Sequence, residues 1–380
     1  MTTIVQIAPE IGPGTGVGSV AHHLEQEWRR TGVTVERFTL TESGGAWLPT
    51  PRGGLQGRLA VLARVVWFSS VGTRRARRYL ADHPETVSVC HNDVLAGDIY
   101  VNHGLVQAAM RSRGAYWYRI LRNPLHLFTT VRDKRRYTSA THRLVVNLSD
   151  QDQRLLRELH PSLRPGTAVV TNGVDTSEFV PPSADARRAE RESLGLTEND
   201  VLAVFIGHEY ARKGLDLVVD ALDQCPDHVR LLVVGGSPDL VAGMESRAAA
   251  VRNRARITFV GPSRDPRPWL RAADVLCLPS AYEASPLVVL EALSMGVPVI
   301  GTRTGSIPDV VEHGVNGYLV ERSATSVAEA LDLLSEADRP SLRQAARRTA
   351  EQHTWAHVAA RYVELLDGLR DAPGRGREAS

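Results

Sequence analysis

Two glutamates whose spacing could position a ligand lie on either side of the start of a short predicted helix. Glu283 precedes this helix, and Glu291 follows eight positions later. Ser285 is expected as the N-cap, Pro286 as the first helical residue and Gly296 as the left-handed terminator. Because the first N–H groups of a helix lack intrahelical partners and carry partial positive charge, this helix start predicts an anion site that fits a diphosphate.

The same helix suggests how the rest of such a ligand would be held. Leu287 and Val288 supply the free N–H groups, while Glu291 stands among apolar residues, where a carboxylate is costly unless donors bond it. Ribose hydroxyls could supply those donors, and Glu283 would then face the sugar end of the ligand. The alternative is that Glu283 is a solvated loop acid and Glu291 a surface residue of an amphipathic helix.

A cation pair, Arg212 and Lys213, follows an apolar segment at 201–206 and precedes another predicted helix. Two cations at a helix entrance can neutralise a diphosphate leaving group as its negative charge grows. Only Lys134 and Lys213 are lysines among the 45 basic residues, so Lys213 is a candidate for a role that needs a compact ammonium. A solvated pair before a helix is the alternative.

The elements that must position these residues alternate between short apolar runs and amphipathic helices, which is typical of parallel α/β sheets. We therefore expect two doubly wound, Rossmann-like domains with ligands at the carboxyl ends of the strands, in the cleft between the domains. The expected domains are 1–178 and 179–353, followed by a helix at 354–370 that packs back on the first domain and a loose tail at 371–380. Expected strands are 4–8, 34–40, 86–90, 99–102, 144–147, 168–171, 201–206, 231–234, 257–260, 275–278 and 297–300.

Taken together, the motifs resemble retaining glycosyltransferase family 4, which has the GT-B fold. The likeness covers nearly the whole chain. The segment from Phe205 to Leu215 is most similar to lipopolysaccharide-core glucosyltransferases, although His208 stands where most relatives have an arginine. The motifs that carry the resemblance are Gly16-Val17-Gly18, Asn172-Gly173-Val174-Asp175 with Phe179, Arg212-Lys213-Gly214, Glu283-x7-Glu291, and Gly305 before Ile307-Pro308-Asp309.

The resemblance implies a hexosyltransferase that retains anomeric configuration and uses a nucleotide-diphosphate sugar, with a UDP-sugar favoured and a GDP-sugar as the alternative. Glu291 would bind the ribose and Glu283 a sugar hydroxyl. His103, at a strand end, would contact the transferred sugar or the acceptor, and His91 is a weaker candidate of the same kind; a satisfied loop histidine is the alternative. The implied donor-binding residues are Gly16, Gly18, Gly207, Arg212, Lys213, Glu283, Ala284, Ser285, Pro286, Leu287 and Glu291, and the implied catalytic residues are His103, Glu283, Arg212 and Lys213.

No cofactor or metal ion is expected. No His, Cys, Asp and Glu grouping has metal-ligand spacing. The acceptor hydroxyl would attack the face that the diphosphate leaves, and a phosphate oxygen can take its proton, so no strong side-chain base is required. The acceptor is expected to be a lipid-linked, saccharide or small-molecule hydroxyl, which places the enzyme in cell-envelope or polysaccharide biosynthesis.

Charge is unevenly distributed although the net charge is only +2. Residues 51–143 hold 16 Arg or Lys against 5 Asp or Glu. Two stretches, 58–78 and 111–136, interleave cations with aromatic and aliphatic residues, which is typical of a surface that binds anionic lipid headgroups. A phosphorylated acceptor is the alternative partner, and no recognition motif points to nucleic acid. We expect a cytoplasmic protein, peripheral at the inner face of the cytoplasmic membrane, without a visible signal peptide and with three free thiols.

Three rival functions compete with this interpretation. Gly16-x-Gly18-x-x-Ala21 with Glu42 imitates a dinucleotide fingerprint, but the turn from Ala8 to Gly16 contains two prolines and is too long for that motif. A sugar-nucleotide epimerase or phosphorylase would keep the same fold. An inactive binding subunit is the third rival, and the intact pair of Glu283 and Glu291 argues against it.

Overall fold

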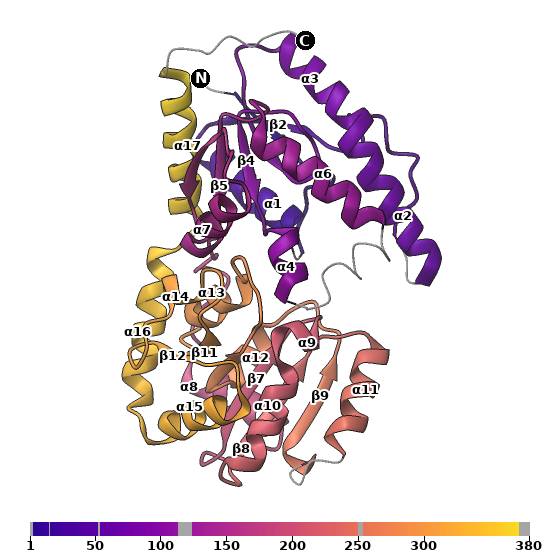
Figure 1. Ribbon diagram of the computed structural model, residues 1–380. Helices are drawn as coiled ribbons and strands as arrows, with labels where there is room; N and C mark the ends of the chain where they lie inside the picture. Colours follow the sequence, from indigo (N-terminus) through magenta and orange to yellow (C-terminus); the bar gives the residue numbers. More distant parts are fainter. Residues whose placement is uncertain (1–2, 15, 52–53, 113–123, 250–253, 372–380) are drawn as a thin grey trace. The chain divides into compact units, whose positions relative to one another are not determined.

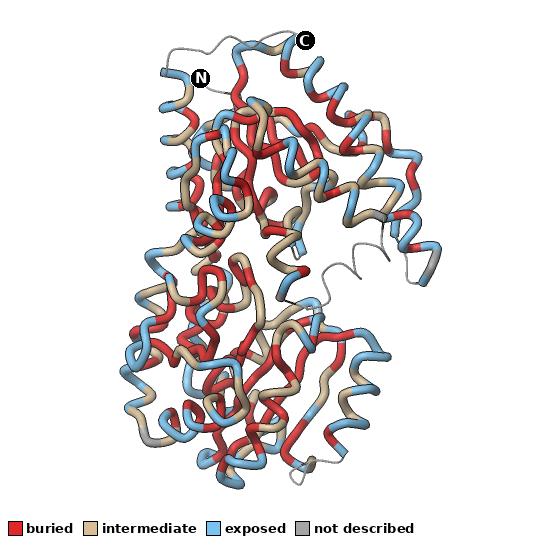
Figure 2. The backbone as a smooth tube through the Cα atoms, viewed as in Figure 1, coloured by how far each residue is buried: buried red, intermediate tan, exposed pale blue. Residues whose placement is uncertain are grey.

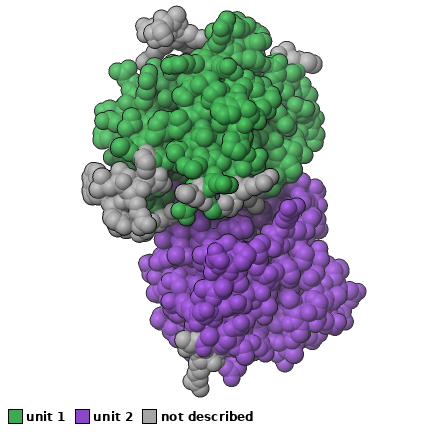
Figure 3. Space-filling model, turned by 90° about the vertical axis from the view of Figure 1, so that its right-hand side faces the viewer, with its two compact units in different colours: residues 1–172, 355–380 green, residues 173–354 purple. Residues whose placement is uncertain are grey.

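The computed structural model of this 380-residue chain describes residues 3–14, 16–51, 54–112, 124–249 and 254–371. It divides into two compact units, which Figure 3 colours separately: unit 1 comprises 1–172 and 355–380, and unit 2 comprises 173–354. The first boundary falls six residues before the expected one. Two hydrogen bonds explain the difference: Val174 N–H donates to His353 O, and Ser294 Oγ donates to Phe179 O. They attach the segment after Asn172 to unit 2.

Unit 1 contains a six-stranded parallel sheet in the order β2-β1-β3-β4-β5-β6, with helices packed around it (Figure 1). The strands are β1 (Thr3–Ile7), β2 (Thr34–Phe38), β3 (Val87–His91), β4 (Ile99–Asn102), β5 (Leu144–Asn147) and β6 (Gly166–Val169). The helices are α1 (Val17–Arg30), α2 (Gly54–Trp67), α3 (Thr73–Asp82), α4 (Val106–Ser112), α6 (Pro124–Thr138), α7 (Asp150–Leu159) and α17 (Trp355–Asp371), with a π-helical turn at Phe68–Gly72.

Helix α17 belongs to unit 1 although the whole of unit 2 precedes it in the chain. Trp28 on α1 donates its indole N–H to Ala359 O at 3.0 Å, and its ring meets Tyr362 edge to face at 6.1 Å. His23 stacks on Trp355 with ring centroids 5.0 Å apart. The aromatic positions of α17 therefore bind it to α1.

Unit 2 repeats the architecture with the strand order β12-β11-β10-β7-β8-β9, again parallel. Its strands are β7 (Val201–Ile206), β8 (Val229–Val234), β9 (Ile257–Gly261), β10 (Val275–Leu278), β11 (Val299–Thr302) and β12 (Gly317–Val320). Its helices are α8 (Ala184–Ser193), α9 (Tyr210–Lys213), α10 (Leu215–Ala221), α11 (Pro238–Ala248), α12 (Arg267–Ala272), α13 (Leu287–Ser294), α14 (Ile307–Val310), α15 (Ala324–Glu336) and α16 (Arg339–Gln352).

Most strands have continuous apolar sequences because both faces of each sheet are buried. Helices cover both faces of a parallel sheet, so residues pointing either way are removed from water. All residues of β3, β4, β10 and β11 are buried, and Figure 2 shows the buried residues concentrated in the central strands of each unit. The expected α/β class with two doubly wound sheets is confirmed. No helix in the described part of the chain is long and apolar enough to cross a bilayer.

Two cations of the expected basic surface turn out to be interior residues. Arg136 is fully buried: it donates to Asp133, Asn92 O and Val94 O, and lies 3.9 Å from the Tyr100 ring centroid. Arg132 pairs with Asp93 at 2.6 Å. A side chain that fixes the fold in this way cannot bind headgroups, so the expectation was wrong for both residues. Phe68 is also fully buried, and residues 113–123 lie outside the described residues.

We expect Arg136→Ala to lower the free energy of unfolding by about 3–5 kcal/mol, because it removes one partner of a buried charge network. Lys134→Ala, on the exposed side of the same helix, should change it by no more than about 0.5 kcal/mol. Urea denaturation of the full chain measures both. Equal effects of the two substitutions would contradict the assignment of Arg136 to the interior.

Candidate functional site

The functional residues predicted in unit 2 lie where two neighbouring parallel strands end. β7 leads through Gly207 into α9, and β10 leads through the segment 279–286 into α13. Because β10 pairs directly with β7, both loops emerge at the same edge of the sheet. In parallel sheets this carboxyl edge is where ligands bind.

Lys213 and Gly207 are packed against each other. A Cβ added at Gly207 would lie 2.3 Å from Lys213 Cδ, so only glycine lets the lysine side chain cross the end of β7. Gly214, at φ +78°, similarly brings its backbone against Pro279 O, which a Cβ would approach to 2.3 Å. The two glycines therefore hold the cation pair against the loop after β10.

Glu283 is the centre of this arrangement. Its Oε1 accepts from Lys213 Nζ at 3.0 Å and from Ser280 Oγ at 3.0 Å, and lies 3.1 Å from Arg212 Nη1. Only 6% of Glu283 is exposed. Burial acts to raise the pKa of this carboxyl, but the charges and hydrogen bonds of Lys213 and Arg212 outweigh it and hold the pKa below its ordinary value. Glu283 is thus an ionised, buried carboxylate, and not a solvated loop acid.

The start of α13 differs by one residue from the expectation. The helix begins at Leu287, and Pro286 occupies the N-cap position with an extended backbone. Ser285 is therefore not the N-cap: its Oγ accepts from Ser306 Oγ at 3.0 Å. The first N–H groups of α13 still have no partner within the helix, as at any helix start. Gly296 follows the helix at φ +69°, which confirms it as the left-handed residue after the C-terminus.

Glu291 lies on α13, and its carboxylate has no hydrogen-bond or ion-pair partner among the residues that the structure describes. Burial is the main reason that its pKa rises to about 7, and the nearby carboxylates of Glu178 and Asp265 add to the shift. Arg267 is occupied by those two acids, at 3.2 Å from Glu178 and 2.8 Å from Asp265. A partly buried acid of this kind needs an outside donor to ionise at little cost.

Sequence reasoning missed several residues of this region. Ser280 completes the shell of Glu283, and its only signal was its place at the end of a predicted strand. Glu178 lies far in the sequence from the pair Asp265 and Arg267, and both segments precede Glu291, so no local pattern could bring the three together. His208 is exposed, with its Nδ1 at 3.4 Å from Gly236 N.

The predicted residues Gly16, Gly18, His91 and His103 belong to unit 1. Gly16 is the N-cap of α1 with φ +82°, a conformation that favours glycine. A Cβ at Gly18 would lie 3.0 Å from Glu10 O, so the loop after β1 folds closely over the start of α1. A Cβ added at Gly16 would have no other atom within 4 Å.

His91 and His103 form a pair at the carboxyl ends of β3 and β4. His91 Nδ1 lies 3.0 Å from His103 Nε2, and His91 is fully buried. Burial lowers the pKa of His103 to about 4, and burial together with the nearby His103 holds the pKa of His91 well below its ordinary value. Both rings are therefore neutral near pH 7. Since Nε2 of His103 is engaged by His91, Nδ1 is the ring nitrogen that remains for a ligand.

Unit 1 also has a recess of about 470 Å³ that sequence reasoning did not anticipate. It lies at the carboxyl ends of β1 and β2, and its polar lining includes Arg37, Thr39, Glu42 and Arg64. Arg37 pairs with Glu25 at 2.8 Å, and Arg64 pairs with Glu10. The recess thus offers hydroxyl and charged groups already balanced by partners.

Glu291 gives a pH prediction. Its pKa of about 7 in the folded chain exceeds the ordinary 4.5, so its protonated form stabilises the fold below about pH 4.5, and this contribution is lost as the pH rises through 7. As the pH rises from 4.5 to 8, the free energy of unfolding of the Glu291→Gln variant should therefore increase relative to that of the wild type, by at most about 3 kcal/mol.

Urea denaturation at both pH values measures this difference. Glu329→Gln, on an exposed position of α15, is the matched control and should show no pH-dependent gain. A Glu291→Gln difference that is the same at both pH values would contradict the assigned environment.

The chain is similar to known proteins both in sequence and in fold. Residues 186–353 match the family described as glycosyl transferases group 1. The chain is 35% identical over 244 residues to a D-inositol 3-phosphate glycosyltransferase of Jonesia denitrificans, covering 60% of this chain and 57% of that protein. It is 30% identical over 224 residues to an alpha-maltose-1-phosphate synthase of Mycolicibacterium smegmatis, covering 54% of this chain and 58% of that protein. The chain therefore spans little more than half the length of these curated relatives.

Solved structures match over nearly the whole chain. WaaG, a glycosyltransferase involved in lipopolysaccharide biosynthesis, superposes with a TM-score of 0.73 at 19% identity, over 96% of this chain and 100% of that one. Sucrose-phosphate synthase from Thermosynechococcus elongatus gives 0.74 at 20% identity, over 98% and 100%. Anabaena HepE in complex with UDP-glucose gives 0.69 at 20% identity, over 97% and 100%. Residues 186–353 are thus similar to the family of group 1 glycosyl transferases, and over its length the chain has the GT-B fold.

Proposed function

We propose that this chain is a retaining glycosyltransferase that moves a hexose from a nucleotide-diphosphate sugar to a hydroxyl acceptor. The observation that carries the proposal is the buried cluster of Lys213, Arg212 and Glu283 beside the start of α13, with Glu291 unpartnered among the described residues. The cations and the free helix N–H groups suit a diphosphate, and carboxylates that accept hydrogen bonds suit the hydroxyls of a sugar and a ribose.

Each residue has a role in this proposal. Lys213 and Arg212 stabilise the negative charge that builds on the diphosphate as its bond to the sugar breaks. Glu283, already charged, accepts from a sugar hydroxyl and holds both cations in place. Glu291 accepts from the ribose hydroxyls, and the backbone of Ala284, Ser285, Pro286 and Leu287 lines the phosphates.

The chemistry needs positioning more than a strong base. The acceptor hydroxyl attacks the face from which the diphosphate departs, and a phosphate oxygen takes its proton, so the anomeric configuration is retained. Catalysis then comes from orientation and from stabilisation of the leaving group. His103 presents Nδ1 to the transferred sugar, and Gly16 and Gly18 approach the phosphates with their backbone. The mechanism uses no metal ion and no cofactor.

We infer a UDP-sugar as the preferred donor, with a GDP-sugar as the alternative. The support is that HepE, which shares the fold, has been solved with UDP-glucose and with UDP. For the acceptor, the related proteins named above act on an inositol phosphate or form a maltose phosphate, which favours a saccharide or polyol hydroxyl over a protein. The recess at β1 and β2 is the place we propose for it.

We expect Lys213→Ala and Glu291→Ala each to lower kcat/KM for the donor at least tenfold, about 1.4 kcal/mol of transition-state stabilisation, because each removes a contact to the donor. The exposed Glu329→Ala should leave it unchanged. The assay follows sugar transfer, or donor hydrolysis without acceptor, across a panel of UDP- and GDP-sugars, and NMR of the product reads the anomeric configuration.

Two results would contradict the proposal. One is unchanged kinetics in folded Lys213→Ala and Glu291→Ala variants, which would remove the assigned site. The other is the absence of both turnover and donor binding across the panel, which would point to a subunit without activity. Formation of an epimer would indicate a sugar-nucleotide epimerase, and formation of a sugar phosphate would indicate a phosphorylase, in place of a transferase.

We also propose that unit 1 contacts an anionic membrane surface through α2 and α6, as a peripheral protein at the cytoplasmic face. Exposed apolar side chains lie on both helices: Leu59 and Val66 on α2 are 56% and 38% exposed, and Leu127 and Val131 on α6 are 55% and 62% exposed. Exposed cations lie on the same helices, Arg58 on α2 and Lys134 and Arg135 on α6, and Arg74 and Arg78 are exposed on α3. Insertion of apolar side chains with cations at the headgroups supports such binding.

The double variant Lys134→Glu/Arg135→Glu should bind vesicles of phosphatidylglycerol and phosphatidylcholine at least tenfold more weakly, since each surface cation contributes about 1 kcal/mol at an anionic membrane. The control variant, Arg188→Glu/Arg348→Glu, reverses two exposed cations of unit 2 and should bind as the wild type does. Vesicle flotation measures both. Equal losses in the two variants would show that net charge, and not this surface, drives binding.

A further inference from the structure

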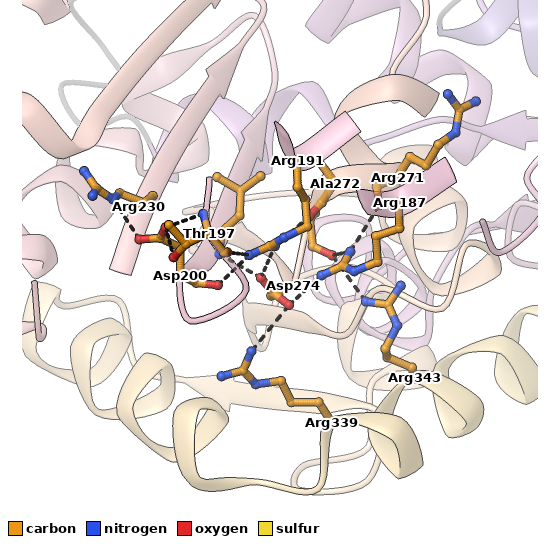
Figure 4. Close-up of polar contacts among 12 residues, drawn as sticks. Arg187, Arg191, Thr197, Asp200, Arg230, Arg271, Ala272, Asp274, Arg339 and Arg343 are labelled. Carbon is orange, nitrogen blue, oxygen red and sulfur yellow. Dashed lines mark hydrogen bonds and ion pairs between the residues drawn. The ribbon is translucent and has the colours of Figure 1, made fainter. Parts of the chain in front are cut away.

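A buried carboxylate at the beginning of β10 in unit 2 is surrounded by arginines (Figure 4). Asp274 is 6% exposed and uses both oxygens. Oδ2 accepts from Leu202 N–H at 2.9 Å and from Arg191 Nη1 at 2.8 Å, while Oδ1 accepts from Arg187 Nη2 at 2.7 Å. The two nearest arginines therefore already satisfy this acid.

Two further arginines crowd the same point from another helix. Arg187 and Arg191 are four residues apart on α8, and Arg339 and Arg343 are four residues apart on α16, so each pair lies on one helix face. These four residues form what we call the arginine cradle. Asp274 Oδ1 lies 3.6 Å from Arg339 Nη1.

Arg343 joins the cradle through a shared acceptor. Its Nη1 donates to Ala273 O at 3.3 Å, and the same carbonyl accepts from Arg187 Nη1 at 2.6 Å. Within the described residues, the carbonyl of Ala273 and the carboxylate of Asp274 are the partners of the Arg343 and Arg339 guanidinium groups. Most of their N–H donors, five on each group, therefore point to no protein acceptor.

The charge of the cradle is not balanced. Three guanidinium groups lie within ion-pair distance of one carboxylate, and the fourth, of Arg343, bonds the adjacent carbonyl of Ala273, so four positive charges gather around one negative charge. The other nearby acids are engaged elsewhere: Glu190 pairs with Arg271 at 3.0 Å, and Asp200 pairs with Arg230 at 3.1 Å. Backbone carbonyls that accept hydrogen bonds from Arg187 and Arg191 compensate part of this surplus, and water or an anion must compensate the rest.

Burial limits compensation by water. The side chains of Arg187, Arg191 and Arg339 are 20%, 10% and 31% exposed. Burial, reinforced by the neighbouring guanidinium groups, lowers the pKa of Arg187 to about 10. The pKa of Arg343 is lowered as well, first by burial and then by Arg191. The cradle opens to solvent mainly at Arg339, which gives a small ion a way in.

We propose that the arginine cradle is a binding site for a phosphate group, held by Arg339 and Arg343 with Arg187 at its base. Planar guanidinium groups bind phosphate oxygens through paired N–H donors, and three groups arriving from two helices fit a tetrahedral oxyanion better than a planar one. The phosphate belongs to a free phosphate compound or to a lipid headgroup.

The site is separate from the donor site. Asp274 immediately precedes β10, whereas Glu283 follows its end, so the cradle lies at the amino edge of the sheet and the donor residues at the carboxyl edge. A bound anion would join α8, the first helix of unit 2, to α16, its last. Because the unfolded chain does not assemble the cradle, binding raises the stability of the fold by mass action.

The test replaces chloride by inorganic phosphate at constant ionic strength and follows the full chain by thermal unfolding and titration calorimetry. We expect a saturable rise in Tm with a half-maximal phosphate concentration below about 10 mM, and at least tenfold weaker binding in Arg339→Gln/Arg343→Gln. Without phosphate this double variant should be at least as stable as the wild type, because it removes surplus charge.

Two control variants make the result specific. Lys213→Ala removes a cation from the donor site and should keep the phosphate response, while Arg348→Gln, exposed on the same helix α16, should also keep it. A second arm measures binding to vesicles of phosphatidic acid against phosphatidylcholine. A response to free phosphate or to phosphatidic acid that the double variant loses supports the site and identifies the source.

Three outcomes would overturn the proposal: no response to phosphate or phosphatidic acid, a linear response that chloride or acetate matches, or a response that Arg339→Gln/Arg343→Gln retains. A response lost in Lys213→Ala alone would assign the phosphate to the donor site and equally reject the cradle. None of these outcomes depends on whether the chain transfers sugars.

Discussion

The ion pair between Lys213 and Glu283 is the interaction on which the rest of the site depends. A carboxylate buried to this degree survives as a charge only because two cations and a hydroxyl surround it. Those partners sit in place because Gly207 and Gly214 let the backbones of two neighbouring loops approach. Removing a cation would leave an uncompensated buried acid, so binding chemistry and local stability are coupled at this point of unit 2.

In the part of the chain that the structure describes, some of the buried charged side chains have partners of opposite charge, and others do not. Arg136 and Arg132 are paired inside unit 1 and hold its loops and helices together. Glu291, by contrast, is partly buried without a partner among the described residues, and the arginine cradle has more cations than acids. Folding alone gives no reason to keep such groups, since each raises the free energy of the native state. Incomplete charge balance therefore points to ligands.

Burial also sets the protonation states of the two histidines in unit 1. Removing His91 and His103 from water keeps both rings neutral, so they act as hydrogen-bonding groups and not as cations near pH 7. Their contact also leaves a single nitrogen of His103 for a ligand. This suits the mechanism that we propose, in which substrates are positioned and no strong side-chain base is needed.

Local sequence determined the α/β class, the parallel strands apart from β12, the glycine after α13 and the position of a cation pair after a strand end. These features depend on periodicity, on backbone conformations that only glycine adopts easily, and on neighbours along the chain. The tertiary structure decided the rest. Whether Arg136 faces solvent, whether Glu283 is ionised, and which acids surround Glu291 depend mainly on residues that are distant in the sequence. Burial and charge pairing are properties of the packed chain, so no local pattern could fix them.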